Sequence, residues 1–138
     1  MNYLLDTATW ANSVIMPEVL PEKVRRLVGT REKKGLASVS LLECAIHYRH
    51  ERLQLQSTLR DFFVLGLADD IELLELTPDI AAATNELPKN FPGDPFDRVI
   101  AATARLRNLR LVTPDPVIRD AAFCQVEYYP FRPSRRIR

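Results

Sequence analysis

Acidic residues at four separate points of the chain could together bind a hard cation. They are Asp6, Glu43, Asp97 and Asp115. Carboxylates that crowd together repel one another, and a divalent cation removes that repulsion. Oxygen ligands with neither Cys nor an obligatory His favour Mg²⁺ or Mn²⁺, which pair with phosphates and activate water against a phosphodiester. If the fold gathers these acids, the chemistry indicated is metal-assisted phosphodiester hydrolysis.

Helix capping is the competing explanation for the same acids. Asp94 and Pro95 form a typical helix start, with proline in the first position, which puts Asp97 third in the helix. Ser40 and Glu43 have the S-x-x-E spacing of a capping box. The other two acids also precede predicted helices. Helix capping alone explains the four acids unless the fold brings them together in space.

Short apolar strands alternate with helices along the chain. We expect strands at residues 2–5, 36–39, 71–76, 110–112 and 124–129, and helices at 8–11, 17–34, 40–54, 58–67, 77–86, 94–108 and 115–122. This alternation predicts an α/β fold of three layers, a mainly parallel sheet of about five strands with helices on both faces. Because the carboxyl ends of parallel strands meet at one edge, the four acids can converge on one cleft.

The composition indicates a folded globular chain. Of 138 residues, 46% are hydrophobic and 27% charged, and we expect one domain over residues 1–138 with a basic tail at 130–138. The net charge of +1 gives no overall attraction to nucleic acid or a membrane. The two cysteines have no CxxC spacing, and no signal peptide or transmembrane span is visible. We therefore expect a cytoplasmic protein with reduced thiols and no membrane partner.

Two histidines follow Glu43 on the same predicted helix. The pattern E-x-x-x-H-x-x-H, formed with His47 and His50, lacks the H-E-x-x-H order of zinc hydrolases. We interpret it as a solvated polar face rather than a metal site with histidine ligands.

The segments that carry the acids resemble a known family. MNYLLDTATW, SVSLLECAIHYR, DPFDRVIAATA and LVTPD are similar to the corresponding segments of PIN-domain ribonucleases, specifically the VapC-type toxins of bacterial type II toxin–antitoxin systems. The resemblance covers nearly the whole chain, in order. It implies a three-layer PIN-like domain and a Mg²⁺-dependent endoribonuclease, with Mn²⁺ as a substitute, that hydrolyses RNA with a metal-activated water. It also implies a homodimer and a VapB-like antitoxin partner.

The resemblance assigns roles to the four acids. It implies that all are catalytic, and that Asp6, Asp97 and Asp115 bind the metal while Glu43 acts through water. Prolines precede and follow Asp115 where many members have a basic and a bulky residue, so the local path there departs from the family pattern.

Four further residues match supporting positions of the family. Thr7 and Thr113 fall where small polar side chains hold the ligands through hydrogen bonds. Asp94 matches a less strictly required acid, interpreted as a cap or a support for the ligands. Arg98 is a candidate contact for a substrate phosphate, with a structural ion pair or an exposed side chain as the alternative.

Two other functions remain open at this point. A phospho-acceptor signalling domain also clusters acids at strand ends, but it places an acidic pair after the first strand and a lysine after a late one. Here the first strand ends in a single Asp, and no lysine follows Lys89. The third possibility is a catalytically inert binding module in which the acids are only caps.

Overall fold

A parallel sheet forms the centre of the computed structural model, which describes residues 1–130. Most of the predicted basic tail, residues 131–138, lies outside the described part. The five strands have the order β3-β2-β1-β4-β5 and all pair in parallel. Their bounds are β1 Tyr3–Leu5, β2 Lys34–Ala37, β3 Ile71–Leu74, β4 Arg110–Thr113 and β5 Val126–Tyr128. The predicted α/β class with a parallel sheet is confirmed.

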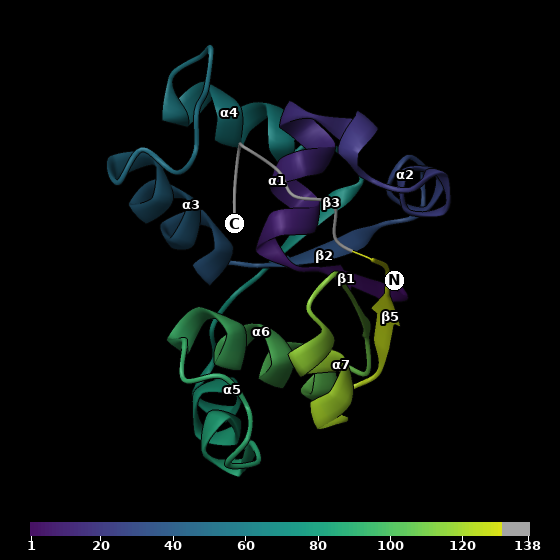
Figure 1. Ribbon diagram of the computed structural model, residues 1–138, viewed down its shortest axis with the longest axis vertical. Coiled ribbons are helices and arrows are strands. Elements are labelled where there is room, and N and C mark those ends of the chain that lie inside the picture. The colour runs from purple at the N-terminus through teal and green to yellow at the C-terminus, as the bar shows by residue number, and fades with distance from the viewer. Residues whose placement is uncertain (131–138) are drawn as a thin grey trace.

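Helices cover the sheet on both sides, as Figure 1 shows. The upper layer in that view contains α1 (Thr7–Ile15), α2 (Glu22–Val28), α3 (Val39–Arg49) and α4 (Leu59–Gly66). The lower layer contains α5 (Pro78–Ala83), α6 (Pro95–Leu106) and α7 (Pro116–Ala121), and short 3-10 turns occur at Pro17–Val19 and Thr84–Glu86. None of the helices within residues 1–130 has the length and apolar character needed to cross a membrane.

Each face of the sheet has its own hydrophobic core. Leu4 and Leu111 pack with the layer of α5, α6 and α7, whereas their neighbours Leu5 and Val112 pack with the opposite layer. This division follows from the alternation of side chains along a strand. Trp10 is fully buried in the second core.

The predicted helix over residues 17–34 is wrong in extent. The chain forms a 3-10 turn at Pro17–Val19, continues extended through Leu20 and Pro21, and only then enters α2. A residue before proline disfavours the helical region, which explains the break at Leu20. Gly29 ends α2, and Lys34 already belongs to β2.

The start and end of α3 also differ from the expectation. The N-cap is Ser38, no side chain caps the helix, and α3 ends at Arg49 rather than near residue 54. Glu51 follows with φ of 60°, in the left-handed region that normally favours glycine. Because no glycine marks this stop, the sequence pattern did not reveal it.

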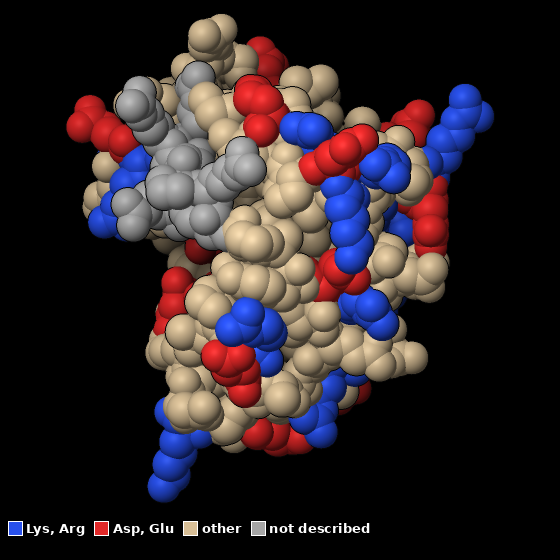
Figure 2. All heavy atoms as spheres, turned by 45° about the vertical axis from the view of Figure 1, so that its right-hand side comes forward, with Lys and Arg blue, Asp and Glu red and all other residues tan. Residues whose placement is uncertain are grey.

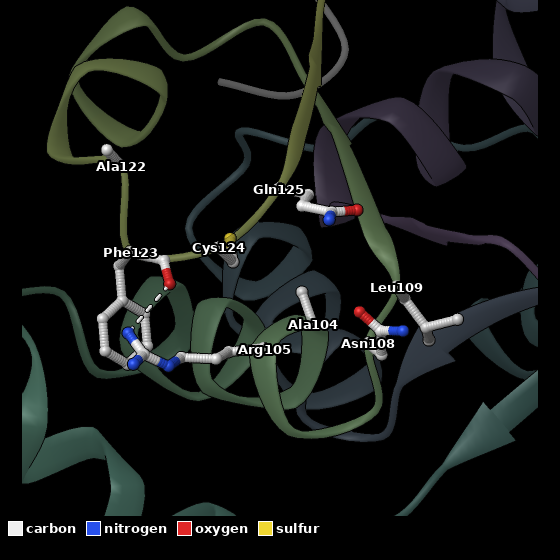
Figure 3. A pocket seen from close by; sticks show the side chains of 8 residues that line it. All are labelled: Ala104, Arg105, Asn108, Leu109, Ala122, Phe123, Cys124 and Gln125. Carbon is white, nitrogen blue, oxygen red and sulfur yellow. Dashed lines mark hydrogen bonds between the residues drawn. The ribbon is translucent and has the colours of Figure 1, made fainter.

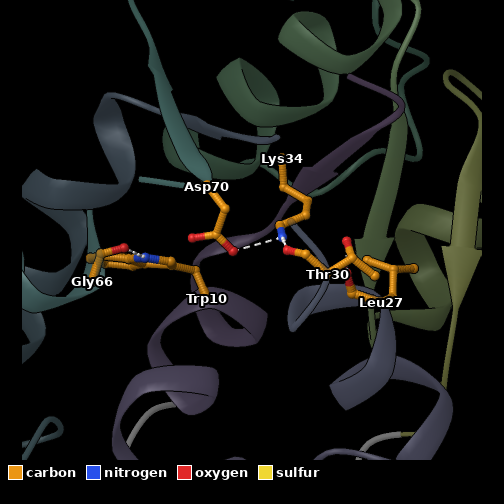
Figure 4. Close-up of polar contacts among 6 residues, drawn as sticks. All are labelled: Trp10, Leu27, Thr30, Lys34, Gly66 and Asp70. Atoms are coloured by element: carbon orange, nitrogen blue, oxygen red, sulfur yellow. Dashed lines mark hydrogen bonds and ion pairs between the residues drawn. The ribbon is translucent and has the colours of Figure 1, made fainter. Parts of the chain in front are cut away.

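Lys34 is buried at the amino end of β2, with only 1% of its side chain exposed. Its ammonium group donates to the carbonyl of Thr30 at 2.7 Å and to Asp70 at 2.8 Å, as shown in Figure 4. A buried charge requires such partners. Lys34 therefore does not belong to the basic surface that neighbouring Arg31 and Lys33 would suggest.

A close approach of Trp10 to Gly66 fixes α1 against α4. The indole Nε1 donates to the Gly66 carbonyl at 2.7 Å, a contact also visible in Figure 4. A Cβ atom on Gly66 would lie 2.5 Å from Cζ2 of Trp10, so only glycine fits. Phe62, on the same helix, packs against the indole with ring centroids 5.1 Å apart.

Charges of both signs are mixed on the surface. Lys and Arg side chains lie among Asp and Glu on the face seen in Figure 2, with no large patch of either charge. Exposed ion pairs such as Arg26–Glu22 and Arg119–Asp120, both 2.9 Å, have the same mixed character. This face has no broad attraction for a phosphate chain.

Candidate active site

A cavity of about 340 Å³ opens at the carboxyl edge of the sheet. It lies between β1 and β4, where the order of the strands in the sheet reverses direction, which is the usual ligand position in open α/β sheets. Its acidic lining consists of the four predicted acids and one more: Asp6, Glu43, Asp94, Asp97 and Asp115. The fold therefore brings together acids that are far apart in sequence.

Asp6 is both a helix cap and a lining residue of the cavity. Its Oδ1 accepts from the backbone N–H of Thr9 at 2.7 Å, which caps α1. Its Oδ2 accepts from the hydroxyl of Thr113 at 2.5 Å. The β1–β4 register pairs Leu5 with Val112 and thereby puts the next residue of each strand side by side. Thr113 thus donates a hydrogen bond to one of the four acids.

Glu43 lies in the second turn of α3 and has no capping role. Its Oε1 accepts from the hydroxyl of Thr7 at 2.6 Å, and that hydroxyl also lies 2.8 Å from Oγ of Ser40. The expected capping box is wrong, because Ser40 faces Thr7 instead of capping α3. Helix capping therefore does not explain Glu43, whose carboxylate instead accepts the hydrogen bond from Thr7.

Asp94 and Asp97 occupy the predicted positions at the start of α6. Asp94 caps the helix through a 2.8 Å bond from the N–H of Phe96, and Pro95 is first in the helix. The carboxylates of Glu43, Asp94 and Asp97 each offer an oxygen within 4.8 Å of the other two. Asp94 therefore does more than cap the helix, since its carboxylate joins the other acids.

Asp115 keeps its place at the cavity despite the neighbouring prolines. Its Oδ1 accepts from the N–H of Val117 at 2.9 Å and caps α7, with Pro116 first in that helix. Pro114 and Pro116 both line the cavity beside it.

The group of three neighbouring carboxylates, Glu43, Asp94 and Asp97, differs from the ligand set that the resemblance implied. That set was Asp6, Asp97 and Asp115, with Glu43 acting through water. The structure places Asp97 nearest to Glu43 and Asp94, and no such group of three among residues 1–130 includes the other two acids. Asp97 is common to both sets.

No Lys or Arg side chain within residues 1–130 pairs with the acids of the cavity. Burial and, after it, the negative charges of Asp94 and Glu43 together raise the pKa of Asp97 to about 8. Burial also raises the pKa of Glu43, to about 7 despite the hydrogen bond from Thr7. None of the Lys and Arg ion pairs in residues 1–130 involves these carboxylates. Oxygen donors with unbalanced charge fit Mg²⁺ or Mn²⁺.

His47 was missed as a neighbour of the acids. It is not on a solvated face: 12% of its side chain is exposed, and Nε2 lies 3.6 Å from Oε2 of Glu43. Its Nδ1 is buried without a hydrogen-bond partner among the described residues. The i,i+4 spacing in the sequence was the available signal. His50, by contrast, is exposed.

Arg98 has a structural role. Its guanidinium donates to the carbonyls of Thr84 at 3.1 Å and Pro92 at 3.3 Å, and it does not line the cavity. These bonds fasten the loop before α6 to the helix. Arg98 forms no ion pair with an acid in residues 1–130, so the expected structural ion pair is wrong, and its guanidinium is bound by backbone carbonyls instead.

A second hollow, of about 380 Å³, lies at the opposite edge of the sheet (Figure 3). It is bounded by the end of α6 and the residues before β5. There Arg105 donates to the carbonyl of Phe123 at 3.1 Å and lies over its ring at 4.5 Å. None of the predicted site residues lines this hollow.

Known proteins share both the sequence pattern and the fold. A family model described as the PIN domain matches residues 3–123. The chain is 34% identical over 104 residues to Ribonuclease VapC22 of Mycobacterium tuberculosis, covering 75% of this chain and 79% of the relative. Two solved structures have the same fold. VapBC2 from Rickettsia felis bound to a promoter DNA fragment gives a TM-score of 0.70 at 18% identity, over 93% of this chain and 98% of that one. DNA-bound VapBC from Salmonella typhimurium gives 0.69 at 23%, over 92% and 97%. This chain therefore belongs to the PIN-domain family, with the VapC proteins as its relatives.

Proposed function

We propose that this chain is a Mg²⁺-dependent endoribonuclease, the toxin of a toxin–antitoxin pair, and that residues 1–138 form one PIN-like domain. The observation that carries the proposal is the gathering of five carboxylates in one cavity without a Lys or Arg ion-pair partner in residues 1–130. The relative named a ribonuclease, at 34% identity, supports RNA as the substrate.

The acids would hold the ion, with Asp97 as the common member of both candidate ligand sets. When bound, Mg²⁺ or Mn²⁺ would supply Lewis acidity that activates a water and stabilises the leaving oxygen of the phosphodiester. The residues of the chain set the orientation of the ligands. Thr113 fixes Asp6 and Thr7 fixes Glu43, as hydrogen-bonded supports of metal ligands do. Without such supports, neighbouring carboxylates would turn away from one another.

The test is RNA cleavage by the purified protein, with the ends of the products mapped. We expect cleavage in Mg²⁺ and none in EDTA. Because the attacking group is a water rather than the ribose 2′-hydroxyl, a substrate with a 2′-deoxy residue at the cut site should still be cleaved. Products with a 2′,3′-cyclic phosphate would contradict this mechanism. A chain that kept the fold without catalysis would cut no RNA at all.

We further propose a VapB-like antitoxin partner, a homodimer and a cytoplasmic location. The structural neighbours are themselves complexes of VapB with VapC, which supports the partner. Apolar side chains remain exposed on the upper helical layer: Leu42 at 57%, and Val64 and Leu65 at 68% each. A surface of this kind can accept an amphipathic helix. Co-expression with a small reading frame upstream should yield a stable complex that no longer cleaves RNA, and light scattering gives its stoichiometry.

A further inference from the structure

We propose that Pro114 and Pro116 hold one nucleobase of the RNA next to the bond that is cut. This inference rests on the proposed function, because the phosphate held at the acids decides which bases lie near. It concerns the part of the cavity that the metal chemistry does not use. Besides five acids and Thr7, the cavity is lined by four apolar residues, called the apolar wall below: Ala8, Pro114, Pro116 and Ile118.

The cavity has room for more than a metal ion. Its volume is about 340 Å³. A Mg²⁺ ion that kept six waters would take up roughly 180 Å³, at about 30 Å³ for each water. Because the cavity also contains the apolar wall, the remaining space suits a group with an apolar surface.

The apolar wall and the neighbouring carboxylates come from different elements. Pro114 follows β4 directly, and Pro116 and Ile118 belong to α7. Glu43 lies on α3 and Asp97 on α6. An ion held by these carboxylates and a base on the apolar wall therefore do not need the same side chains.

The base is the part of a nucleotide that fits the apolar wall. A phosphate or a ribose hydroxyl would lose water there without gaining a hydrogen bond, and no Lys or Arg of residues 1–130 lines the cavity. The flat face of a base is covered without that cost, and single-stranded RNA presents unstacked bases. A base that flanks the cut phosphate is also kept near by its own covalent bonds.

Local structure fixes the two proline rings relative to the acids. Pro114 is buried, and Pro116 is exposed at the first position of α7. Between them, Asp115 donates its N–H to Oγ1 of Thr113 at 3.2 Å and accepts from the N–H of Val117 at 2.9 Å. The pyrrolidine ring also fixes φ. A surface that is already in place loses little conformational entropy when a base binds to it.

Pro116→Ala tests the proposal, with Pro78→Ala as the matched control. Pro78 is also exposed and first in its helix after a capping residue, but it does not line the cavity. Alanine lacks two methylene groups of proline, each of which contributes about fourfold to affinity when fully buried. In cleavage of a fluorophore-labelled RNA that contains the mapped cut site, Pro116→Ala should raise KM about fivefold with kcat unchanged. Pro78→Ala should match the wild type.

Abasic RNA separates a contact with the base from an effect on the fold. Two further substrates lack the base on one side or the other of the cut. One of them should raise the KM of the wild type about tenfold. On that substrate Pro116→Ala should equal the wild type, because the ring has no base left to contact. Pro116→Val keeps an apolar side chain and should retain most of the affinity for intact RNA.

Thermal unfolding checks that each variant is folded. A loss in Pro116→Ala that persists on both abasic substrates, an unchanged KM on intact RNA, or an equal loss in Pro78→Ala would overturn the proposal. So would abasic substrates that the wild type cuts with the KM of intact RNA, a result that needs no variant. If the wild type cuts no RNA, the proposed function itself fails. If it cuts RNA and the missing base has no effect, only this inference fails.

Discussion

Replacing Asp97 by asparagine should stabilise the metal-free protein while abolishing its proposed activity. The carboxylate lies among other acids, and no hydrogen bond to another described residue accounts for any of its pKa shift. Asparagine has nearly the same shape and removes the repulsion without losing a described contact. Replacing an ordinary surface acid at a helix N-terminus by asparagine would instead destabilise the protein, because the negative charge interacts favourably with the helix dipole.

The size of the effect follows from the raised pKa of Asp97, about 8 against an ordinary value of 3.8. At about pH 7 Asp97 is ionised in the unfolded chain and protonated in the folded chain. Because each tenfold change in proton affinity corresponds to about 1.4 kcal/mol, the upper limit for the stabilisation by Asp97→Asn is about 4 kcal/mol. Because Glu43 and Asp94 share the repulsion, we expect about half of this, or about 2 kcal/mol and a rise in Tm of about 6 °C.

The sign of the pH dependence is also determined. The folded state binds more protons than the unfolded state between pH 3.8 and about 8. The stability of the metal-free wild type should therefore fall as pH rises through that window. The advantage of Asp97→Asn over the wild type should grow over the same range and then level off.

Thermal and urea unfolding in EDTA measure this difference. Asp61→Asn is the matched control, since Asp61 is third in α4 as Asp97 is third in α6, but it is exposed and lies outside the acidic cavity. It should lose about 0.5 kcal/mol or less. Added Mg²⁺ should stabilise the wild type and leave Asp97→Asn unchanged. A variant Asp97→Asn that is less stable than the wild type in EDTA, or a stability difference that does not vary with pH, would contradict the repulsion at Asp97.

Other substitutions test the contacts that position the site. Asp70→Ala leaves the buried ammonium of Lys34 without its acid partner and should cost about 3 kcal/mol in urea unfolding; a cost below about 1 kcal/mol would argue against the buried pair. Gly66→Ala drives a methyl group into Trp10 and should cost about 2 kcal/mol, with altered indole fluorescence; unchanged stability and fluorescence would mean that the two helices are less closely packed. Thr7→Val removes the donor to the glutamate of α3 and should weaken Mn²⁺ binding by calorimetry about tenfold, while an unchanged Kd would contradict its role as a support.

The sequence was a good guide to elements that begin with strong capping signals. Asp94 with Pro95, and Asp115 with Pro116, start their helices where predicted. Thr77 also caps the helix that it precedes. Proline in the first helical position fixes the backbone locally, so such starts do not depend on the rest of the fold.

Boundaries that depend on tertiary contacts were harder to predict. Ser40 has the spacing of a cap, but its hydroxyl faces Thr7, 33 residues away in sequence. Lys34 stands close to Arg31 and Lys33 in the sequence, yet its side chain is buried, because Asp70 lies across from it just before the neighbouring strand β3. Local patterns cannot show a partner that only the sheet brings near.

The convergence of the acids could be predicted from topology, whereas their exact grouping could not. Parallel strands place Asp6 and Asp115 at one edge whatever the detailed packing. The approach of α3 to α6, which brings Glu43 within reach of Asp94 and Asp97, is set by how two helical layers meet. No spacing in the sequence encodes that distance.

The most direct test of metal-dependent RNA cleavage is a Mg²⁺ titration. The cleavage rate is measured for the wild type and for Asp97→Asn under the same conditions. The wild type should show no cleavage in EDTA and a rate that rises with Mg²⁺ to saturation. Asp97→Asn, folded and more stable without metal, should remain below detection at every concentration. Cleavage that persists in EDTA, or a variant that keeps the wild-type rate, would contradict the assignment of the acidic cavity.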